Sequence, residues 1–278
     1  MRAFHEHRNY ITSFSFSAFQ VDNFNFLAHW HPDIELVYVQ EGRLRMGINA
    51  ESRVLEQGDI AVCGSGDIHY YDSMGEKSSL ILVIFNPRLI GSPGGWPVDI
   101  ELISNFVTRV NKSKEESELI RSRAGQLMQE MLAESKQREK NYEMLVTAKL
   151  YELCGLLMRH WTEDAATGRG NARRIENNRI MQDVLDFLDA NYTREVKLED
   201  GAKLARMSIF HFSKYFKSAS GMSYIVYLNQ LRVRHAEQLV LQTDRKMIDI
   251  TLDAGFTNIR TFNRVFKQVR GIKPSDLR

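Results

Sequence analysis

The sequence is poor in the residues that build crosslinked or membrane-spanning proteins. Its two cysteines, Cys63 and Cys154, lie far apart and show no metal-type spacing. A disulfide framework is therefore excluded, and a protein kept reduced is the simplest prediction. No apolar run approaches the roughly 18 residues that a membrane span requires, and the N-terminal Met1–His5 segment lacks the apolar core of a signal peptide. These absences predict a cytoplasmic protein without a membrane partner.

What the chain does contain is typical of a globular protein of one large domain or two ordinary ones. It has 278 residues, of which 43% are apolar and 26% charged, enough for sizeable cores. The net charge of +2 is unevenly distributed: residues 171–278 hold 19 Lys and Arg against 12 Asp and Glu, whereas residues 1–170 hold 18 against 23. A basic C-terminal part that binds DNA, joined to an acidic part that does not, fits this distribution.

Residues 10–86 have the pattern of β-structure. The segment Thr12–Phe19 alternates apolar and polar residues, as a half-buried strand does. Turn residues, among them Glu41–Gly42, separate four further apolar segments: Ile34–Val39, Arg43–Ile48, Asp59–Cys63 and Ser79–Phe85. Short strands at near-regular spacing predict a sandwich or barrel. Prolines and glycines in residues 87–98 end it with an irregular connector, which places the barrel domain at residues 1–98.

One group of polar residues stands out within this predicted barrel. His29 and His31 are two apart, so on a strand they share a face and point into one cavity. Glu35 and His69 complete three imidazoles and one carboxylate if they approach from neighbouring strands, a set that suits a divalent transition metal. The spacing resembles the first and second motifs of the cupin fold, with glycine where the second motif usually has proline. Cupins are small jelly rolls that bind metals, sugars or other small ligands in the barrel mouth.

Three interpretations of this group stay open. The four residues are candidate effector-binding residues in a metal-free pocket, candidate ligands of a divalent metal, or buried side chains with a structural role. No cofactor is required by the first and third interpretations. Metal-dependent enzyme chemistry is the alternative function that the same scaffold allows, since a fold does not settle function. We expect a sensor rather than an enzyme because the chain also carries the two modules described below.

Residues 99–161 show helical periodicity. Two apolar stripes each predict the buried face of a helix. The first stripe consists of Ile120, Ala124, Leu127, Met128 and Met131. The second consists of Tyr142, Leu145, Lys149, Leu153, Leu156 and Trp161. We expect this region to pack on the barrel and to form an antiparallel dimer contact. Residues 162–174 are polar with no apolar period and are interpreted as a linker. A further helix with Ile180, Val184 and Leu188 on its buried face is expected to stop near Asn191.

Residues 175–278 form the last predicted domain, which contains one short module twice. The segment Phe212–Lys217 is matched fifty residues later by Phe262–Lys267. Each module has a short helix, a tight turn and a second helix with basic residues outside, the arrangement of a DNA-reading helix-turn-helix. The predicted details include a cap by Ser208, a left-handed Gly255, a cap by Thr257 or Asn258, and two buried phenylalanine pairs, Phe212 with Phe216 and Phe262 with Phe266.

The second module resembles the DNA-binding domain of the AraC/XylS family of bacterial transcription regulators. The matching positions are Ile248, Ile250, Ala254, Gly255, Phe256, Phe262, Arg264, Phe266, Lys267, Gly271 and Pro274. The chain departs from the family at Thr251, where alanine is usual, at Gly201, where an apolar residue is usual, and at Arg206, where glycine or a small polar residue is common. We therefore expect the first module to depend more on its neighbours for packing.

The resemblance implies an α+β chain of two domains, with an N-terminal cupin jelly-roll barrel and flanking helices before an all-α domain with two helix-turn-helix motifs. It implies a regulator, more often an activator, that binds double-stranded DNA, responds to a sugar or related metabolite, forms a homodimer and contacts RNA polymerase. The implied DNA-binding residues lie on the two second helices: Phe210, Ser213, Lys214 and Lys217; Arg260, Thr261, Asn263, Arg264 and Lys267. Arginine can bond guanine and asparagine adenine, while Lys217 and Lys267 hold phosphates.

Overall fold

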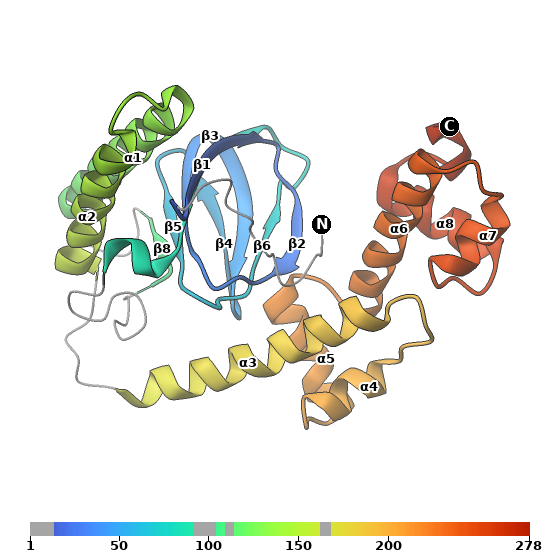
Figure 1. Ribbon diagram of the computed structural model, residues 1–278. Helices are drawn as coiled ribbons and strands as arrows, with labels where there is room; N and C mark the ends of the chain where they lie inside the picture. The colour runs from blue at the N-terminus through green and yellow to red at the C-terminus, as the bar shows by residue number, and fades with distance from the viewer. Residues whose placement is uncertain (1–13, 92–103, 109–113, 162–167) are drawn as a thin grey trace.

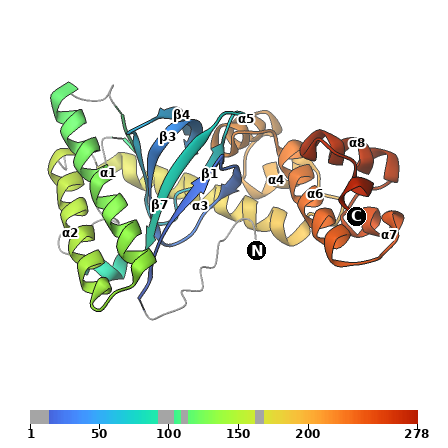
Figure 2. The same ribbon diagram turned by 90° about the horizontal axis from the view of Figure 1, so that it is seen from above.

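The computed structural model describes residues 14–91, 104–108, 114–161 and 168–278, arranged as a β-barrel between two helical parts. A helical hairpin lies on one side of the barrel and a larger helical domain on the other (Figures 1 and 2). Within the described ranges, no helix is long and apolar enough to cross a membrane. The predicted order of a barrel, a helical region and a C-terminal helical domain is confirmed.

The barrel is built from antiparallel strands in two sheets that share one long strand. The first sheet has the order β1–β7–β3–β5–β8, and in the second β6 lies between β2 and β3, with β4 on the other edge. The bounds are β1 Phe16–Asp22, β2 Phe26–His29, β3 Ile34–Ile48, β4 Glu51–Glu56, β5 Ile60–Cys63, β6 His69–Asp72, β7 Ser78–Phe85 and β8 Phe106–Val107. All eight residues of β7 are buried because the barrel interior covers one face and the helical hairpin the other.

Two expectations for the β-structure were wrong. The segments Ile34–Val39 and Arg43–Ile48 were predicted as separate strands with a turn at Glu41–Gly42, but β3 runs through both and bends where its register shifts between Val39 and Glu41. A bulged strand can turn a barrel corner without ending. The first part of β3 therefore pairs with β5 and, as far as Gly42, with β7, and the part from Arg43 on pairs with β4 and β6. Strand β8 lies in a segment that was predicted to be helical.

The helical hairpin covers the outer face of the first sheet. Helix α1 spans Lys114–Gln137 and α2 spans Tyr142–Trp161, and a short 3-10 helix, Pro87–Ile90, follows β7. The predicted buried face of α1 is confirmed, since its five residues are at most 1% exposed. The predicted face of α2 is confirmed in part: Leu153 is buried and Tyr142 and Leu156 pack against the core, but Leu145 is 48% exposed. The centre of the buried face lies about one residue further on, at Val146, Leu150, Cys154 and Leu157.

The C-terminal domain contains the two predicted helix-turn-helix modules. Its helices are α3 Gly168–Asn191, α4 Leu198–Leu204, α5 Ile209–Ser220, α6 Tyr224–Gln242, α7 Met247–Asp253 and α8 Ile259–Arg270, followed by a 3-10 helix, Pro274–Leu277. Helix α3 begins at Gly168, so residues 168–174 are helical rather than linker, while residues 162–167 lie outside the described residues. The expected end near Asn191 is confirmed.

The two modules differ in what they pack against, as expected from their departures. The second has a core of its own, which includes Phe256, Phe262 and Phe266. The core of the first contains Phe212 and Phe216 together with residues of the barrel: Ala28, Ile68 and Tyr70. Gly201 belongs to this close packing, because a Cβ there would lie 2.6 Å from the Phe212 ring and 2.8 Å from that of Tyr224. The unusual glycine therefore admits two aromatic rings rather than weakening the module.

Candidate ligand site and nucleic-acid interface

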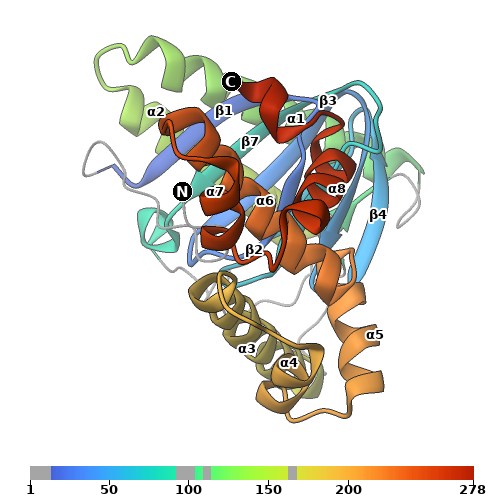
Figure 3. The same cartoon turned by 90° about the vertical axis from the view of Figure 1, so that its right-hand side faces the viewer.

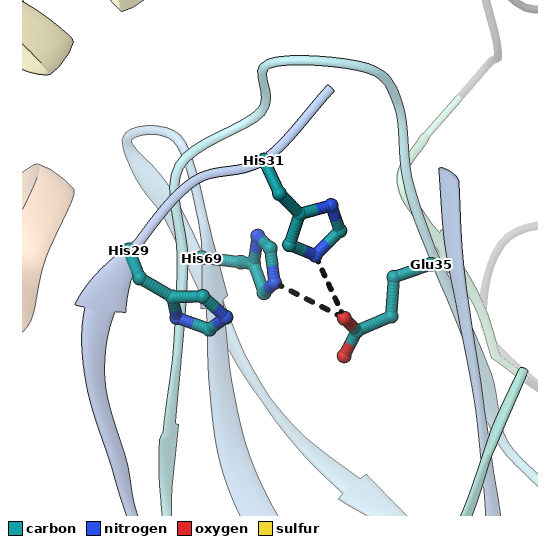
Figure 4. Close-up of side chains that lie close together, drawn as sticks. All are labelled: His29, His31, Glu35 and His69. Atoms are coloured by element: carbon teal, nitrogen blue, oxygen red, sulfur yellow. Dashed lines mark hydrogen bonds and ion pairs between the residues drawn. The ribbon is translucent and has the colours of Figure 1, made fainter. Parts of the chain in front are cut away.

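The four predicted ligand residues meet inside the barrel. His29 ends β2, His31 lies in the loop after it, Glu35 is near the start of β3 and His69 starts β6 (Figure 4). One ligand atom from each lies within 4.8 Å of the others. Each residue is at most 2% exposed. The structure thus brings together residues up to forty positions apart, as the sequence predicted, and buries them more deeply than the mouth of a barrel would.

Backbone carbonyls hold all three imidazoles in the same way. The Nδ1 atoms of His29, His31 and His69 lie 3.0, 2.9 and 3.0 Å from the carbonyl oxygens of Leu27, Asp33 and Asp67. A carbonyl accepts only, so each Nδ1 carries the proton and donates it. Nε2 is then the ring atom that each histidine turns toward a ligand, and such outer hydrogen bonds orient the histidine ligands of metal sites.

Glu35 supplies the negative charge of the cluster. Its Oε2 lies 3.0 Å from His31 Nε2 and 3.5 Å from His69 Nε2, while Oε1 accepts a hydrogen bond from the Tyr71 hydroxyl. Burial alone would raise the pKa of Glu35, but the charge on His69 and the hydrogen bond from His31 outweigh it and hold the pKa well below its ordinary value. Glu35 is therefore a carboxylate.

The histidines differ in protonation because Glu35 acts unequally on them. Burial lowers the pKa of His29 well below its ordinary value, and the neighbouring His69 lowers it further. Burial also lowers the pKa of His69, but Glu35 outweighs it and the net pKa is raised. His69 Nε2 is buried and accepts or donates no hydrogen bond among the described residues. A neutral His29, an anionic carboxylate and a His69 Nε2 that lies 3.5 Å from Glu35 suit a divalent cation, whose binding displaces protons from its ligands.

Two aromatic residues that the sequence did not single out complete the cluster. Tyr71 lies two residues after His69 on β6 and bonds to Glu35. The Phe26 ring lies 4.5 Å from that of His29, centroid to centroid. The period of two along a strand could have pointed to Tyr71, because it places residues 69 and 71 on one face. Nothing in the sequence pairs Phe26 with His29, since a register shift separates them on β2.

The strands that carry the histidines also hold the first helix-turn-helix module. The Tyr227 hydroxyl of α6 donates to the carbonyl of Ala28, at 2.7 Å. The Asn178 amide of α3 donates to the Asp67 carboxylate, at 3.0 Å, and the carbonyl of the same Asp67 accepts from His69. The Tyr70 ring packs so closely on Gly221, after α5, that a Cβ there would lie 2.6 Å from it. Each histidine strand is thus bonded to the cluster on one side and to the helical domain on the other.

The predicted DNA-binding residues lie on the outer faces of α5 and α8. All of them are exposed except Ser213 and Thr261, which are half-buried. The Ser208 side chain caps α5 and Asn258, rather than Thr257, caps α8. Gly255 has φ 85° in the second turn, and Arg206 has φ 53° in the first, so a non-glycine residue adopts the left-handed turn conformation where the family commonly has glycine.

The basic side chains of α8 form one outward row. Arg260, Arg264 and Lys267 follow at spacings of four and three, which places them on one face, while Phe262 and Phe266 are fully buried on the opposite side. On α5 the Lys214 ammonium lies 4.4 Å from the centre of the Phe210 ring. Cations and one exposed aromatic ring on two helices suit a DNA groove and its phosphates.

Comparison with known proteins agrees with both halves of the structure. A family described as a helix-turn-helix domain matches residues 202–278, and one described as a cupin domain matches residues 17–85. The chain is 24% identical over 255 residues to the melibiose operon regulatory protein of Escherichia coli K12, covering 90% of this chain and 83% of that protein. It is 25% identical over 255 residues to the transcriptional activator RhaS of Mannheimia succiniciproducens, covering 91% and 89%.

A further relative matches a shorter stretch of the chain. The chain is 32% identical over 101 residues to the lactose operon transcription activator of Staphylococcus xylosus, covering 36% of each protein. The chain therefore belongs to the AraC/XylS family of DNA-binding transcription regulators, with a cupin domain ahead of its helix-turn-helix domain.

Proposed function

We propose that this regulator activates transcription from the cytoplasm in response to a sugar or related metabolite, and that a divalent transition metal bound by the barrel cluster belongs to the response. Two relatives are named for the melibiose and lactose operons, and two are named as activators, which supports the metabolite class and the direction. Activation would require contact with RNA polymerase.

The metal proposal is supported by the donor set. His29, His31, Glu35 and His69 would hold the ion through three Nε2 atoms and one carboxylate, and Nδ1 bonds already orient the rings. Such a set suits zinc, manganese, iron, nickel or copper. The ion would supply a positive charge that binds all four residues together. Because the cluster is at most 2% exposed, we assign it a sensing or structural role rather than catalysis.

One observation carries the proposed control: the histidine strands β2 and β6 are among those that hold the DNA-binding domain. A ligand that draws β2 and β6 together shifts the positions of Ala28 and Asp67, which bond to Tyr227 and Asn178. The docked and released arrangements then differ in affinity for the ligand, which is the condition for a population shift. The operator affinity should therefore depend on whether the cluster is occupied.

The test measures operator affinity for zinc-loaded and zinc-stripped protein by fluorescence anisotropy. We expect the two affinities to differ by about 5–150-fold, the usual range of coupling between sites. Tyr227→Phe, which removes only the hydroxyl that bonds to Ala28, should bring the ratio closer to one. Tyr215→Phe is the matched control, since its hydroxyl bonds to Asn177 within the C-terminal domain. Equal affinities in the wild type, or a ratio unchanged by Tyr227→Phe, would refute the proposed control.

We also propose that α2 forms the dimer contact expected from the sequence. Met144 and Tyr151 are 73% and 46% exposed, and with the exposed Ala148 and Gly155 they form a stripe at spacings of four, three and four. This spacing is that of a helix–helix seam, in which small residues allow close approach.

Placing charges on this stripe should separate the protomers. Met144→Glu combined with Tyr151→Glu would bury unpaired carboxylates in the seam, at a cost of several kcal/mol, so the dissociation constant should rise at least about 100-fold. Light scattering after gel filtration should give the dimer mass for the wild type and the monomer mass for the variant. Lys140→Glu, which changes an exposed residue beside the hairpin turn, is the control. A dimer mass that persists in the double variant would exclude this helix as the interface.

A further inference from the structure

The barrel and the C-terminal domain border an open cavity of about 670 Å³, away from the histidine cluster. Its walls come from the β1–β2 turn and β2, from β6 and the turn after it, from the α5–α6 turn, and from α6 and the end of α8. Figure 3 looks from the C-terminal domain onto the barrel, with α6 in front of it. Cavities of roughly 300–1,000 Å³ are the usual size for small-molecule sites. Neither the predicted effector residues nor the DNA-binding residues line this one.

Arg234 of α6 is the main charged group in this cavity. It is half-buried, and burial lowers the pKa of Arg234 from its ordinary value. Its guanidinium makes no hydrogen bond and no ion pair with any residue in the described ranges; Asp189 acts on it only from beyond ion-pair distance. A guanidinium offers five donors, and a half-buried charge without a hydrogen-bond partner lowers stability. A bound anion would satisfy it.

Two uncharged groups in the wall also lack partners. Gln230 lies one helical turn before Arg234 on the same face of α6 and lines the cavity. Tyr70 lines it from β6, in the other domain. Neither side chain has a hydrogen bond within the part of the chain that the structure describes. By contrast the other ionic groups are paired: Asp72 with Arg45 and Arg270 with Glu237.

The remaining wall is mixed, with polar Asn25, Ser73 and Ser220 beside aromatic and aliphatic side chains. Phe26 and Tyr71 line the cavity and also contact the buried cluster, through His29 and Glu35. A polar wall with a few aromatic surfaces suits a hydroxylated ligand better than an apolar one. A rigid ring of hydroxyl-bearing carbons would use the aromatic surface and the Gln230 and Tyr70 groups, and an acid group would pair with Arg234.

We propose that this interdomain cavity binds a small hydroxylated organic anion, of the size and chemistry of a sugar phosphate or sugar acid, with Arg234 holding its acid group. Because the cavity is lined from both domains, such a ligand holds the C-terminal domain in the docked arrangement. This site is distinct from the histidine cluster and does not depend on a metal there, so its test and that of the proposed function can fail separately.

The test is a thermal-shift measurement on the full chain with glucose 6-phosphate, galacturonate and inorganic phosphate, and with glucose as the neutral comparison. At about ten times its dissociation constant, at least one organic anion should raise the melting temperature by about 2–4 °C, more than phosphate or glucose at the same concentration. Arg234→Gln should raise the dissociation constant of this anion at least about tenfold, and Gln230→Ala should raise it less. Arg179→Gln, an exposed arginine of α3 that lies outside the cavity, should leave it unchanged.

Several outcomes overturn the proposal. One is the absence of any stabilisation by the two organic anions in the wild type. Another is equal stabilisation of the wild type and Arg234→Gln, provided that both unfold cooperatively. If Arg234→Gln fails to fold, Arg234→Lys and Gln230→Ala take its place, and unchanged binding in both overturns it. Repeating the thermal-shift measurement with His31→Ala separates this site from the cluster, because the anion should still stabilise that variant.

Discussion

Replacing Arg264 by alanine is expected to weaken binding to the specific operator by about 1–3 kcal/mol, or roughly 5- to 150-fold, and to relax the base preference at one position. Arg264 is exposed in the middle of the outward face of α8, between Arg260 and Lys267. A guanidinium there can donate two hydrogen bonds to one guanine edge, which alanine cannot replace. The loss of binding affinity should be large for the operator and small for unrelated DNA.

The comparison with Lys267→Ala makes this prediction specific. Lys267 lies near the C-terminal end of the same face, where we propose a phosphate contact, so its removal should weaken specific and nonspecific DNA about equally and lower the salt dependence of binding. Operators selected from a random DNA library by the wild-type and variant proteins provide the readout. If the selected sequences and the affinity are the same for Arg264→Ala as for the wild type, Arg264 does not read a base.

The second large effect is expected at the buried cluster. Protein purified without added metal should carry about one divalent ion per chain, and His31→Ala should lower the affinity for it at least about 100-fold, since even loss of an outer hydrogen bond to a metal ligand costs about 10- to 100-fold. Tyr71→Phe removes such an outer hydrogen bond to Glu35, so its loss of metal affinity should be about 10- to 100-fold. Elemental analysis measures the metal content, and titration with a chromophoric chelator measures the metal affinity.

His211 supplies a matched control for the metal experiment. It is an exposed histidine on α5, away from the cluster, so His211→Ala should leave the metal content unchanged. Sub-stoichiometric metal in the wild type that is unaffected by His31→Ala would rule out the metal site. The four residues would then be polar lining of a buried pocket, and the occupancy-dependent control proposed above would need another ligand.

Local patterns predicted those parts of the structure whose residues interact within one element or one turn. The phenylalanine pairs of α5 and α8 are buried as the spacing of four indicated, and the helix caps stand at Ser208 and Asn258. The face of α2 was predicted only in part because that helix is apolar on more than one side: one stripe packs on the barrel and Met144 and Tyr151 face outward. A periodicity does not show which of two apolar stripes is covered.

Long-range pairing decided the features that the sequence pattern placed wrongly. The turn residues Glu41–Gly42 became a bend within β3 because a barrel corner and a hairpin use similar residues. Residues 168–174 were interpreted as linker because they have no apolar period, yet they begin α3. In both cases the local composition was compatible with two structures, and pairing or helix propagation from the adjoining segment selected one.

By itself the sequence determined the repeated helix-turn-helix modules, the outward row of Arg260, Arg264 and Lys267, and the set of three histidines and one glutamate, because each is a short-range pattern of residue types. Only the tertiary structure showed that the histidine strands also hold the C-terminal domain, that Gly201 and Gly221 admit aromatic rings, and that Arg234 faces an interdomain cavity without a partner among the described residues. These features depend on contacts between residues far apart in the chain, which leave no periodicity within either segment, so the chain has to fold before they can be seen.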